Sequence, residues 1–189
     1  ETTGVRHKHA GNFDTEIYEN LFWGGKRGVL LRSFRSNEIR DNVFLDLSES
    51  AIVSYVENTK GELRASVHHN NLFDTTRLLT DVVGLHGHPH RLDFHHNLFH
   101  GAVSGTVFAV STESLSTVTS AGNLYVLPDG AAFSRPTDGA VTAFGPFHAG
   151  LGDTTSALRA PSTGGSDEAA HEAVYQSLAP ERTAGGIGY

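Results

Sequence analysis

The chain has 189 residues, a length at which a single domain buries about 70% of the surface that its unfolded chain exposes. Apolar residues make up 38% and charged residues 19% of the sequence, a globular composition that excludes a disordered chain. The net charge is -7, and no apolar run approaches bilayer length. We therefore expect a soluble protein with neither a nucleic-acid nor a membrane partner.

Cysteine and methionine are both absent. The lack of cysteine excludes disulfide bonds, thiolate nucleophiles and Cys-zinc sites. Because a primary translation product begins with Met, we expect a chain that begins at Glu1 to be processed or to be part of a longer product.

A motif of the form apolar-x-x-Asn-x-apolar recurs along the chain. It occupies residues 17–22, 39–44, 67–72 and 94–99, and its second half returns at 123–125. Its asparagines are 22, 28, 27 and 26 residues apart. Short β-branched or apolar runs lie between the motifs and begin at Gly4, Gly28, Ala51, Asp81, Thr106 and Ala140. Each period therefore holds at least two short strands, with Gly, Asn, Asp and Ser in the turns.

Two folds accommodate strands at this spacing. An antiparallel sandwich can carry Asn in its turns, but it gives no reason for a fixed motif at a fixed period. In a parallel β-helix each coil lies about 4.8 Å from the last, so a residue that recurs once per coil forms a column, and stacked asparagines bond side chain to side chain. We therefore predict an all-β solenoid, a parallel β-helix of about five to six coils, over residues 1–149.

Residues 150–189 follow a different pattern. Gly, Ser, Thr and Pro dominate 150–166, and Ser166 opens a stretch in which Ala170, Val174 and Leu178 share one helix face. Pro180 ends this stretch. We predict a C-terminal tail with a short capping helix that covers the open edge of the last coil.

The repeated segments resemble the right-handed parallel β-helices of the pectate-lyase-like superfamily, whose coils carry the same I-x-x-N-x-F signature. The resemblance covers roughly residues 3 to 145. It implies a right-handed parallel β-helix, while the motif itself reports stacking and not chemistry.

Side-chain alternation separates core from surface in the Gly-Val strands. If the residue after Gly points inward, the core column is Val5, Val29, Ile52, Val82, Val107 and Val141. The outward cations and aromatic that remain are Arg6, Lys8, Arg32 and Tyr55. Of these, Lys8, Arg32 and Tyr55 would form one column across three coils, which predicts a trough for a polyanion. Beside it runs an apolar stripe that we expect a partner to cover, formed by Leu30, Val53, Val83 and Phe108.

Lys8 and Arg32 resemble residues of the β-helical lyases that cleave alginate or dermatan sulfate, in which one coil carries a Lys and the next an L-R dipeptide. The resemblance implies that Lys8 is the general base and that Arg32 protonates or steadies the leaving oxygen. A Lys beside another cation has a lowered pKa, which suits removal of a uronate C5 proton. This sequence lacks the His-Gly after the Arg and the further basic residue that the family carries near position 53. The alternative is that both residues are solvated charges on an exposed strand.

Further residues are expected to bind the substrate. Residues 67–73 followed by Arg77 look like the pectate-lyase run HHN-x-F and the arginine motif after it. The expected binding residues are Arg6, Tyr55, Arg77, His86 and His88. The family's Ca²⁺ ligands would fall before Glu1, so we expect no cofactor held within this chain.

Eight of the 12 histidines lie between His68 and His100. Aligning the repeated asparagines places Asp41, His69 and His96 in one column, and Arg40, His68 and His95 in the next. One Asp and two His form a set that first-row metals accept, but stacked neutral imidazoles also fill a β-helix column. We expect no metal, and Asp41, His69 and His96 are the residues that would hold one.

These observations favour a polysaccharide lyase that cleaves an acidic, uronate-containing polysaccharide and is secreted or periplasmic. Two alternatives stay open. One is a non-catalytic module for glycan binding, adhesion or assembly. The other is a glycoside hydrolase, although Glu57, Asp74, Asp81 and Glu113 form no pair at coil spacing. The expected partners are the polysaccharide and a second chain or upstream fragment that covers the N-terminal coil.

Overall fold

The structure is a computed structural model of the chain, which divides into the units Glu1–Arg159 and Ala160–Tyr189. It describes residues 3–6, 14–31, 36–55, 63–82, 91–100, 106–110, 117–128, 131–134 and 142–160. The helix predicted within 166–180 lies outside these residues. All strands described below belong to the first unit.

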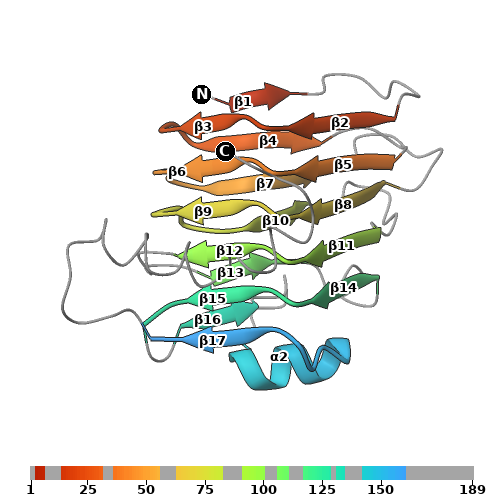
Figure 1. Cartoon of the computed structure of the whole chain (residues 1–189), viewed down its shortest axis with the longest axis vertical. Helices are drawn as coiled ribbons and strands as arrows, with labels where there is room; N and C mark the ends of the chain where they lie inside the picture. Colours follow the sequence, from red (N-terminus) through yellow and green to blue (C-terminus); the bar gives the residue numbers. More distant parts are fainter. Residues whose placement is uncertain are drawn as a thin grey trace. The chain divides into compact units, whose positions relative to one another are not determined.

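The strands form three parallel sheets that run side by side along the stack (Figure 1). Sheet A contains β1 (Thr3–Arg6), β4 (Arg27–Leu31), β7 (Ser50–Tyr55), β10 (Leu79–Val82), β13 (Thr106–Ala109) and β16 (Ala132–Ser134). Sheet B contains β2 (Thr15–Tyr18), β5 (Ser36–Arg40), β8 (Arg64–His68), β11 (Arg91–His95) and β14 (Val118–Ala121). Sheet C contains β3 (Leu21–Trp23), β6 (Val43–Leu45), β9 (Asn71–Phe73), β12 (Leu98–His100), β15 (Leu124–Val126) and β17 (Ala157–Arg159).

Each coil visits sheet A, then B, then C, and every strand pairs in parallel with its equivalent one coil away. The predicted all-β parallel β-helix is confirmed. The coils extend to Arg159, past the boundary predicted at residue 149, because β17 pairs with β15.

The register of sheet A confirms the first part of the predicted core column. Val5 pairs with Val29, and Val29 pairs with Ile52. The next positions in this column are Leu79 and Phe108, so Val82, which pairs with Tyr55, does not share it. Val107 stands one position out of the column, but it is buried in the core as predicted. The column is hard to locate by counting, because the number of residues between sheet C and the column position varies between coils: five (24–28), six (46–51), five (74–78) and seven (101–107).

Phe108 therefore lies in the core and not in the predicted outward stripe. It is fully buried, and its ring centroid is 5.5 Å from that of Phe94. Leu30 and Val53 lie outside the core cluster but are only 5% and 6% exposed, so they offer no open apolar surface. Val83 and Val141 are outside the described residues.

The turn between sheets B and C holds the predicted asparagine ladder. Nδ2 of Asn42 donates to Oδ1 of Asn70, and Asn70 and Asn97 bond in the same way to the next coil, each at 3.0 Å. Asn123 ends the series by donating its backbone N–H to the Ser156 hydroxyl at 2.9 Å. Asn42 and Asn70 are completely buried. The ladder therefore satisfies polar groups that water does not reach.

The residue before each asparagine of the repeated motif, Asn20 included, has a positive φ. The angle is 56° at both Glu19 and Asp41 and 54° at both His69 and His96, and Gly122 takes the position in the next coil at 61°. A non-glycine residue in this left-handed region costs about 1 kcal/mol or more. The hydrogen bonds of the following asparagine offset that cost, which explains why polar residues other than glycine are tolerated in the turn.

Helix α2 (Phe144–Leu151) takes the place of a sheet B strand between β16 and β17. Its Phe147 ring stacks on Phe108 at a centroid distance of 5.1 Å, and its His148 ring lies 5.4 Å from Tyr125. Gly152 ends the helix with a φ of 70°, and its N–H donates to Ala149 O. The core is therefore covered at this end by an aromatic helix face.

Asp153 fixes the return from α2 to sheet C. Its side chain is fully buried, and it accepts hydrogen bonds from the Ser120 hydroxyl at 2.7 Å and from the backbone N–H groups of Thr155 and Ser156. Burial alone would raise the pKa of this carboxyl group, but the hydrogen bonds from Ser156 and Ser120 lower it to about 2. The charged form is therefore the one that holds the turn.

The side chains of Tyr18, Leu21 and Trp23 are exposed on the first coil, by 44%, 61% and 74%. They lie on β2 and β3, the edge strands of sheets B and C. A partner that covers the N-terminal coil stays a prediction.

Asn70→Ala should lower the free energy of unfolding by about 3 kcal/mol, because it leaves buried donors and acceptors of two neighbouring coils unpaired. Asn20→Ala, at the exposed end of the ladder, should cost only about 1 kcal/mol. Urea denaturation followed by circular dichroism measures both. Equal losses for the two variants would contradict the ladder as a source of stability.

Asp153→Asn should destabilise the protein at neutral pH by about 2 kcal/mol, because charge-assisted hydrogen bonds are lost. A carboxyl group whose pKa is lowered on folding stabilises above its ordinary value, 3.8, and loses this contribution as the pH falls towards about 2. The difference in the free energy of unfolding between wild type and variant should therefore become smaller between pH 4 and pH 2. Urea denaturation at a series of pH values measures this difference, and a difference that does not change with pH would contradict the role of the charged carboxylate.

Candidate functional site

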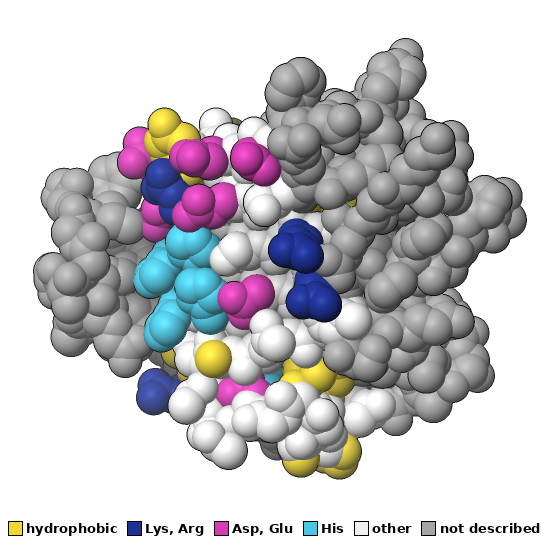
Figure 2. Space-filling model, turned by 90° about the vertical axis from the view of Figure 1, so that its right-hand side faces the viewer, with side chains coloured by type: hydrophobic (Ala, Val, Ile, Leu, Met, Phe, Trp, Pro, Cys, Tyr) yellow, Lys and Arg dark blue, Asp and Glu magenta, His cyan; other side chains and the backbone are white. Residues whose placement is uncertain are grey.

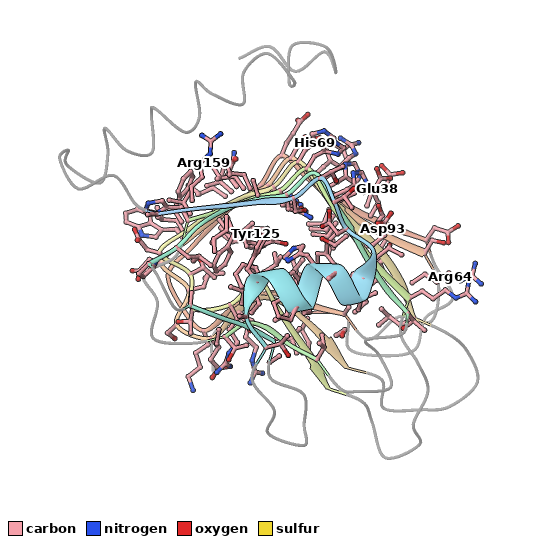
Figure 3. The ribbon with its side chains drawn as sticks, turned by 90° about the horizontal axis from the view of Figure 1, so that it is seen from below. Glu38, Arg64, His69, Asp93, Tyr125 and Arg159 are labelled. Atoms are coloured by element: carbon pink, nitrogen blue, oxygen red, sulfur yellow. The ribbon has the colours of Figure 1, made fainter. Side chains whose placement is uncertain are left out.

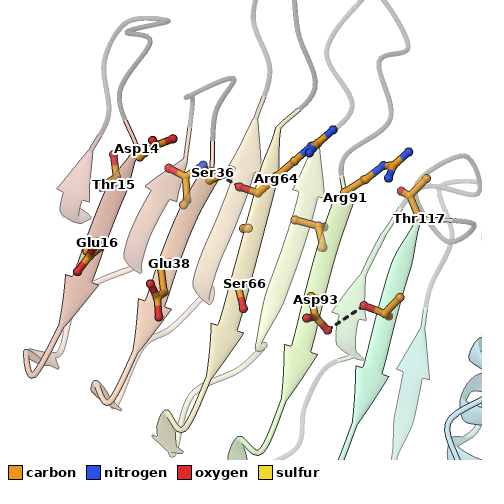
Figure 4. A pocket seen from close by; sticks show the side chains of 14 residues that line it. Asp14, Thr15, Glu16, Ser36, Glu38, Arg64, Ser66, Arg91, Asp93 and Thr117 are labelled. Atoms are coloured by element: carbon orange, nitrogen blue, oxygen red, sulfur yellow. Dashed lines mark hydrogen bonds between the residues drawn. The ribbon is translucent and has the colours of Figure 1, made fainter.

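A groove of about 580 Å³ runs along the outer face of sheet B (Figure 4). It crosses five coils, since residues of β2, β5, β8 and β11 line it together with Thr117 and Thr119 at β14. The strand pattern explains the location: in β5 and β8 alternate residues are buried, so the intervening side chains face outward. The groove therefore consists of side chains stacked in columns along the axis.

Two columns of polar side chains form its floor. The parallel register aligns the first column as Asp14, Ser36, Arg64, Arg91 and Thr117, and the second as Glu16, Glu38, Ser66, Asp93 and Thr119. Arg64 and Arg91 are both exposed and occupy equivalent positions in adjacent coils. Figure 4 shows both side chains pointing away from the sheet. We call the second column, which contains Glu16, Glu38 and Asp93, the acidic column, and we call Arg64 and Arg91 of the first column the arginine pair.

Arg40 joins the acidic column to the turn beside it. Its guanidinium lies 3.3 Å from Glu38 Oε1, 3.0 Å from Asp41 Oδ2 and 3.8 Å from Glu16 Oε2. It also covers the Tyr18 ring at 4.3 Å. The side-chain hydrogen bond that Arg40 donates to Asp41 raises the pKa of Arg40, which stays charged. Arg40 therefore neutralises part of the negative charge at this end of the groove.

Four histidines form a compact patch next to the acidic column. We call His68, His69, His95 and His96 the His tetrad. Figure 2 shows histidine side chains gathered in one patch beside acidic side chains, and Figure 3 places His69 at the corner that follows sheet B. The His68 and His95 rings stack at 4.6 Å, and the His69 and His96 rings stack at 5.4 Å. The two predicted columns are thus confirmed as columns.

The tetrad contacts the groove through carboxylates. His68 Nε2 lies 3.0 Å from Glu38 Oε1, and His95 Nε2 lies 3.9 Å from Asp93 Oδ2. Asp93 also accepts a hydrogen bond from the Thr119 hydroxyl at 2.8 Å. Burial lowers the pKa of His69 and of His95, and the neighbouring imidazole of His68 lowers both further. At pH 7 the neutral forms of His69 and His95 are therefore favoured over their charged forms.

The described residues contain no group of three His, Asp or Glu side chains arranged to hold a metal ion. Asp41, His69 and His96 do share a column, but Asp41 bonds with Arg40 and the imidazoles bond with one another within each coil. We assign none of these three residues as a metal ligand.

The residues predicted to be catalytic, Lys8 and Arg32, lie outside the described residues, as do His86 and His88. Arg6 and Tyr55 lie on β1 and β7, where their backbones pair with Leu30 and Val82. In sheet A, Leu31 pairs with Ser54. These two residues immediately precede Arg32 and Tyr55 in the sequence.

Arg77 lies in the turn between sheets C and A and is not among the residues that line the groove. The structure therefore does not bring this predicted binding residue to the sheet B groove. Its Nε atom is buried without a hydrogen-bond partner.

The acidic column and the arginine pair were not predicted from the sequence. The acids considered for hydrolysis were Glu57, Asp74, Asp81 and Glu113, whereas the column contains Glu16, Glu38 and Asp93. A signal was present: Glu16 and Glu38 each precede the first apolar residue of the repeated motif by one position, and so does Asp93. The arginines Arg64 and Arg91 each stand three residues before that apolar residue.

The His tetrad should make stability depend on pH. A histidine whose pKa is lowered on folding stabilises the folded state fully above its ordinary value of 6.5, and this contribution is lost as the pH falls below it. The melting temperature should therefore drop between pH 7.5 and pH 5, and the double variant His69→Asn/His95→Gln should show a smaller drop. Differential scanning calorimetry measures both curves. Parallel curves for the two proteins would contradict the assignment.

No helix in the described ranges has the length and apolar character needed to cross a membrane. No protein-family model, no curated protein and no solved structure matches this chain.

Proposed function

We propose that the chain holds an extended acidic polysaccharide along the sheet B groove and cleaves it by β-elimination. The observation that carries the proposal is the pair Arg64 and Arg91, aligned in adjacent coils on the groove floor. Coils lie about 4.8 Å apart, so two guanidinium groups can engage charged groups that repeat along one polymer chain. A linear groove across five coils suits a linear ligand.

Arginine suits the carboxylates of uronate residues. Its planar guanidinium donates two parallel hydrogen bonds to one carboxylate and keeps its charge at any working pH. Neutralising the uronate carboxylate is also what makes the neighbouring C5 proton acidic enough to remove. The column of Glu16, Glu38 and Asp93 offers acceptors for sugar hydroxyl groups beside the arginines.

The catalytic assignments rest on the family resemblance and on chain connectivity. Lys8 lies in segment 7–13, which joins β1 to β2, and Arg32 lies in segment 32–35, which joins β4 to β5. The first described residues after these segments, Asp14 and Ser36, line the groove. In the proposed reaction the neutral amine of Lys8 accepts the C5 proton, and the electron pair of that C–H bond forms a C4=C5 double bond as the bond between C4 and the leaving oxygen breaks. Arg32 steadies or protonates that oxygen.

The acidic column favours a second candidate, a glycoside hydrolase. Glu16 and Glu38 occupy adjacent coils, a spacing of about 4.8 Å that is near the roughly 5–5.5 Å between the carboxyl groups of retaining glycosidases. Hydrolysis releases a new reducing end without an unsaturated sugar, so the two reactions have different products.

The test is incubation of the chain with polygalacturonate, alginate and dermatan sulfate, with both the ultraviolet absorbance of unsaturated uronate and new reducing ends recorded. We expect both signals on at least one substrate, and Lys8→Ala should lower the rate by about 100-fold or more. Reducing ends without absorbance would favour the hydrolase. Absorbance that Lys8→Ala leaves unchanged would overturn Lys8 as the base.

The arginine pair has its own test. Arg64→Ala and Arg91→Ala should each weaken polysaccharide binding by about tenfold, since each removes a charged hydrogen-bonding group. Arg159→Ala is the matched control, because Arg159 is an exposed arginine on β17 in sheet C. Isothermal titration calorimetry with polygalacturonate oligomers gives the dissociation constants. Equal losses in all three variants would indicate a general charge effect and exclude a specific groove.

A further inference from the structure

The His tetrad is built from two imidazole pairs, one in each of two adjacent coils. Nδ1 of His68 lies 2.9 Å from Nδ1 of His69, and Nδ1 of His95 lies 3.2 Å from Nδ1 of His96. The rings of each pair are nearly perpendicular, at 84° and 86°. In each pair, one Nδ1 must therefore donate a hydrogen to the other.

Glu38 fixes the direction of the first bond. Its carboxylate accepts a hydrogen bond from His68 Nε2 at 3.0 Å, so Nε2 of His68 carries the hydrogen and Nδ1 of His68 accepts one from His69. One additional proton can enter this pair without breaking the bond, because Nε2 of His69 carries no hydrogen in this arrangement and can accept it while Nδ1 continues to donate. A second additional proton would place two N–H donors face to face. Each pair is thus suited to take up one proton.

The charges around the tetrad are few and mostly negative. From β5 and its turn come Glu38, Arg40 and Asp41, and from β11 comes Asp93. The neighbouring strands β8 and β14 contribute only neutral groups here, Ser66 and Thr119. With neutral imidazoles these side chains carry three negative charges and one positive charge, a net charge of -2. One proton for each pair brings the net charge of the patch to zero, so that it no longer repels an anion and presents charged imidazole N–H donors.

The tetrad is also open to a ligand beside the groove. His96 is exposed, and the side chains of His68 and His95 are 16% and 28% exposed. His68 and His95 follow Ser66 and Asp93 of the groove by two residues on the same outward strand face, and Figure 2 shows the histidine patch adjoining the acidic side chains. A polymer held in the groove would pass next to these imidazoles.

We propose that the His tetrad is an anion-binding extension of the sheet B groove, which forms when its imidazoles take up protons and which holds carboxylates of the polysaccharide in mildly acidic solution. This inference rests on the proposed function. It assigns the tetrad a ligand class, the carboxylate groups of an acidic glycan, and it makes affinity a function of pH. The lowered pKa values of His69 and His95 support it, because they keep these two imidazoles neutral at neutral pH and leave the carboxylates around them uncompensated. A bound carboxylate favours the charged imidazole in return.

The experiment compares binding of polygalacturonate oligomers by the full chain at pH 7.5 and pH 5.5 at constant ionic strength. We expect about tenfold tighter binding at pH 5.5, with proton uptake visible in calorimetric titrations run in buffers of different ionisation enthalpy. His69→Asn/His96→Asn removes one imidazole from each pair. Asn suits both positions because it tolerates the left-handed backbone better than most residues do. This variant should bind with nearly equal affinity at the two pH values.

Asp46→Asn is the matched control. Asp46 also has a left-handed backbone, with a φ of 55°, but it lies in the turn after sheet C. It should retain the full pH dependence. Thermal unfolding of each variant at both pH values verifies that folded proteins are compared.

The outcomes separate the two proposals. Binding that does not change with pH, or a pH dependence that survives in His69→Asn/His96→Asn, would overturn the role of the tetrad and leave the proposed function standing. No binding at either pH would overturn both. Loss of the pH dependence in the tetrad variant alone, with proton uptake abolished, would establish the anion site.

Discussion

The hydrogen bonding of buried asparagines at one corner of the coil is the constraint on which the rest of the structure depends. Asn70 bonds at once to the coil before it and to the coil after it, and it is completely buried. Any slip of one coil against the next would leave these groups unpaired in a place that water does not reach. The corner therefore fixes the register of both adjoining sheets. Sheet B, which leads into that corner, inherits this regularity.

A fixed register gives the outer face of sheet B its chemistry. Equivalent positions in successive coils form straight columns, so a single kind of side chain, once repeated, becomes a line of like groups. Arg64 and Arg91 form such a line, and so do the paired imidazoles of the His tetrad. The acidic column lies between these two lines. A face of this kind carries ordered bands of charge, which the proposed linear ligand would meet in succession.

The sequence was sufficient for the fold but not for the site. The spacing of Asn42, Asn70 and Asn97 predicts both the parallel coils and the ladder, because only a solenoid makes residues at that period neighbours. The same spacing placed His68 above Arg40 and His95 above His68. Sheet A was harder to predict, since its strands carry no equivalent marker and the turns that precede them differ in length. The core position of Phe108 was missed for that reason.

The groove escaped prediction for a different physical reason. Side chains such as Glu38 and Arg64 are polar residues on an exposed strand face, where amino-acid type is weakly constrained by packing. Only the register shows which of them stand in line. Glu38 and Asp93 each lie four residues before the ladder asparagine of their coil. Counting back from these asparagines would have aligned the acidic column, just as it aligned the histidines.

The ladder also has a direction. In each internal coil the asparagine donates to the Oδ1 atom of the next asparagine towards the C-terminus. Its Nδ2 also donates to a backbone carbonyl of the coil towards the N-terminus, so every internal coil makes the same set of bonds to its two neighbours. Such a unit can be duplicated or removed whole without leaving a donor facing a donor. The groove would then lengthen or shorten by one row of side chains. The length of the groove is therefore a modular quantity, set by the number of coils and adjustable in steps of one.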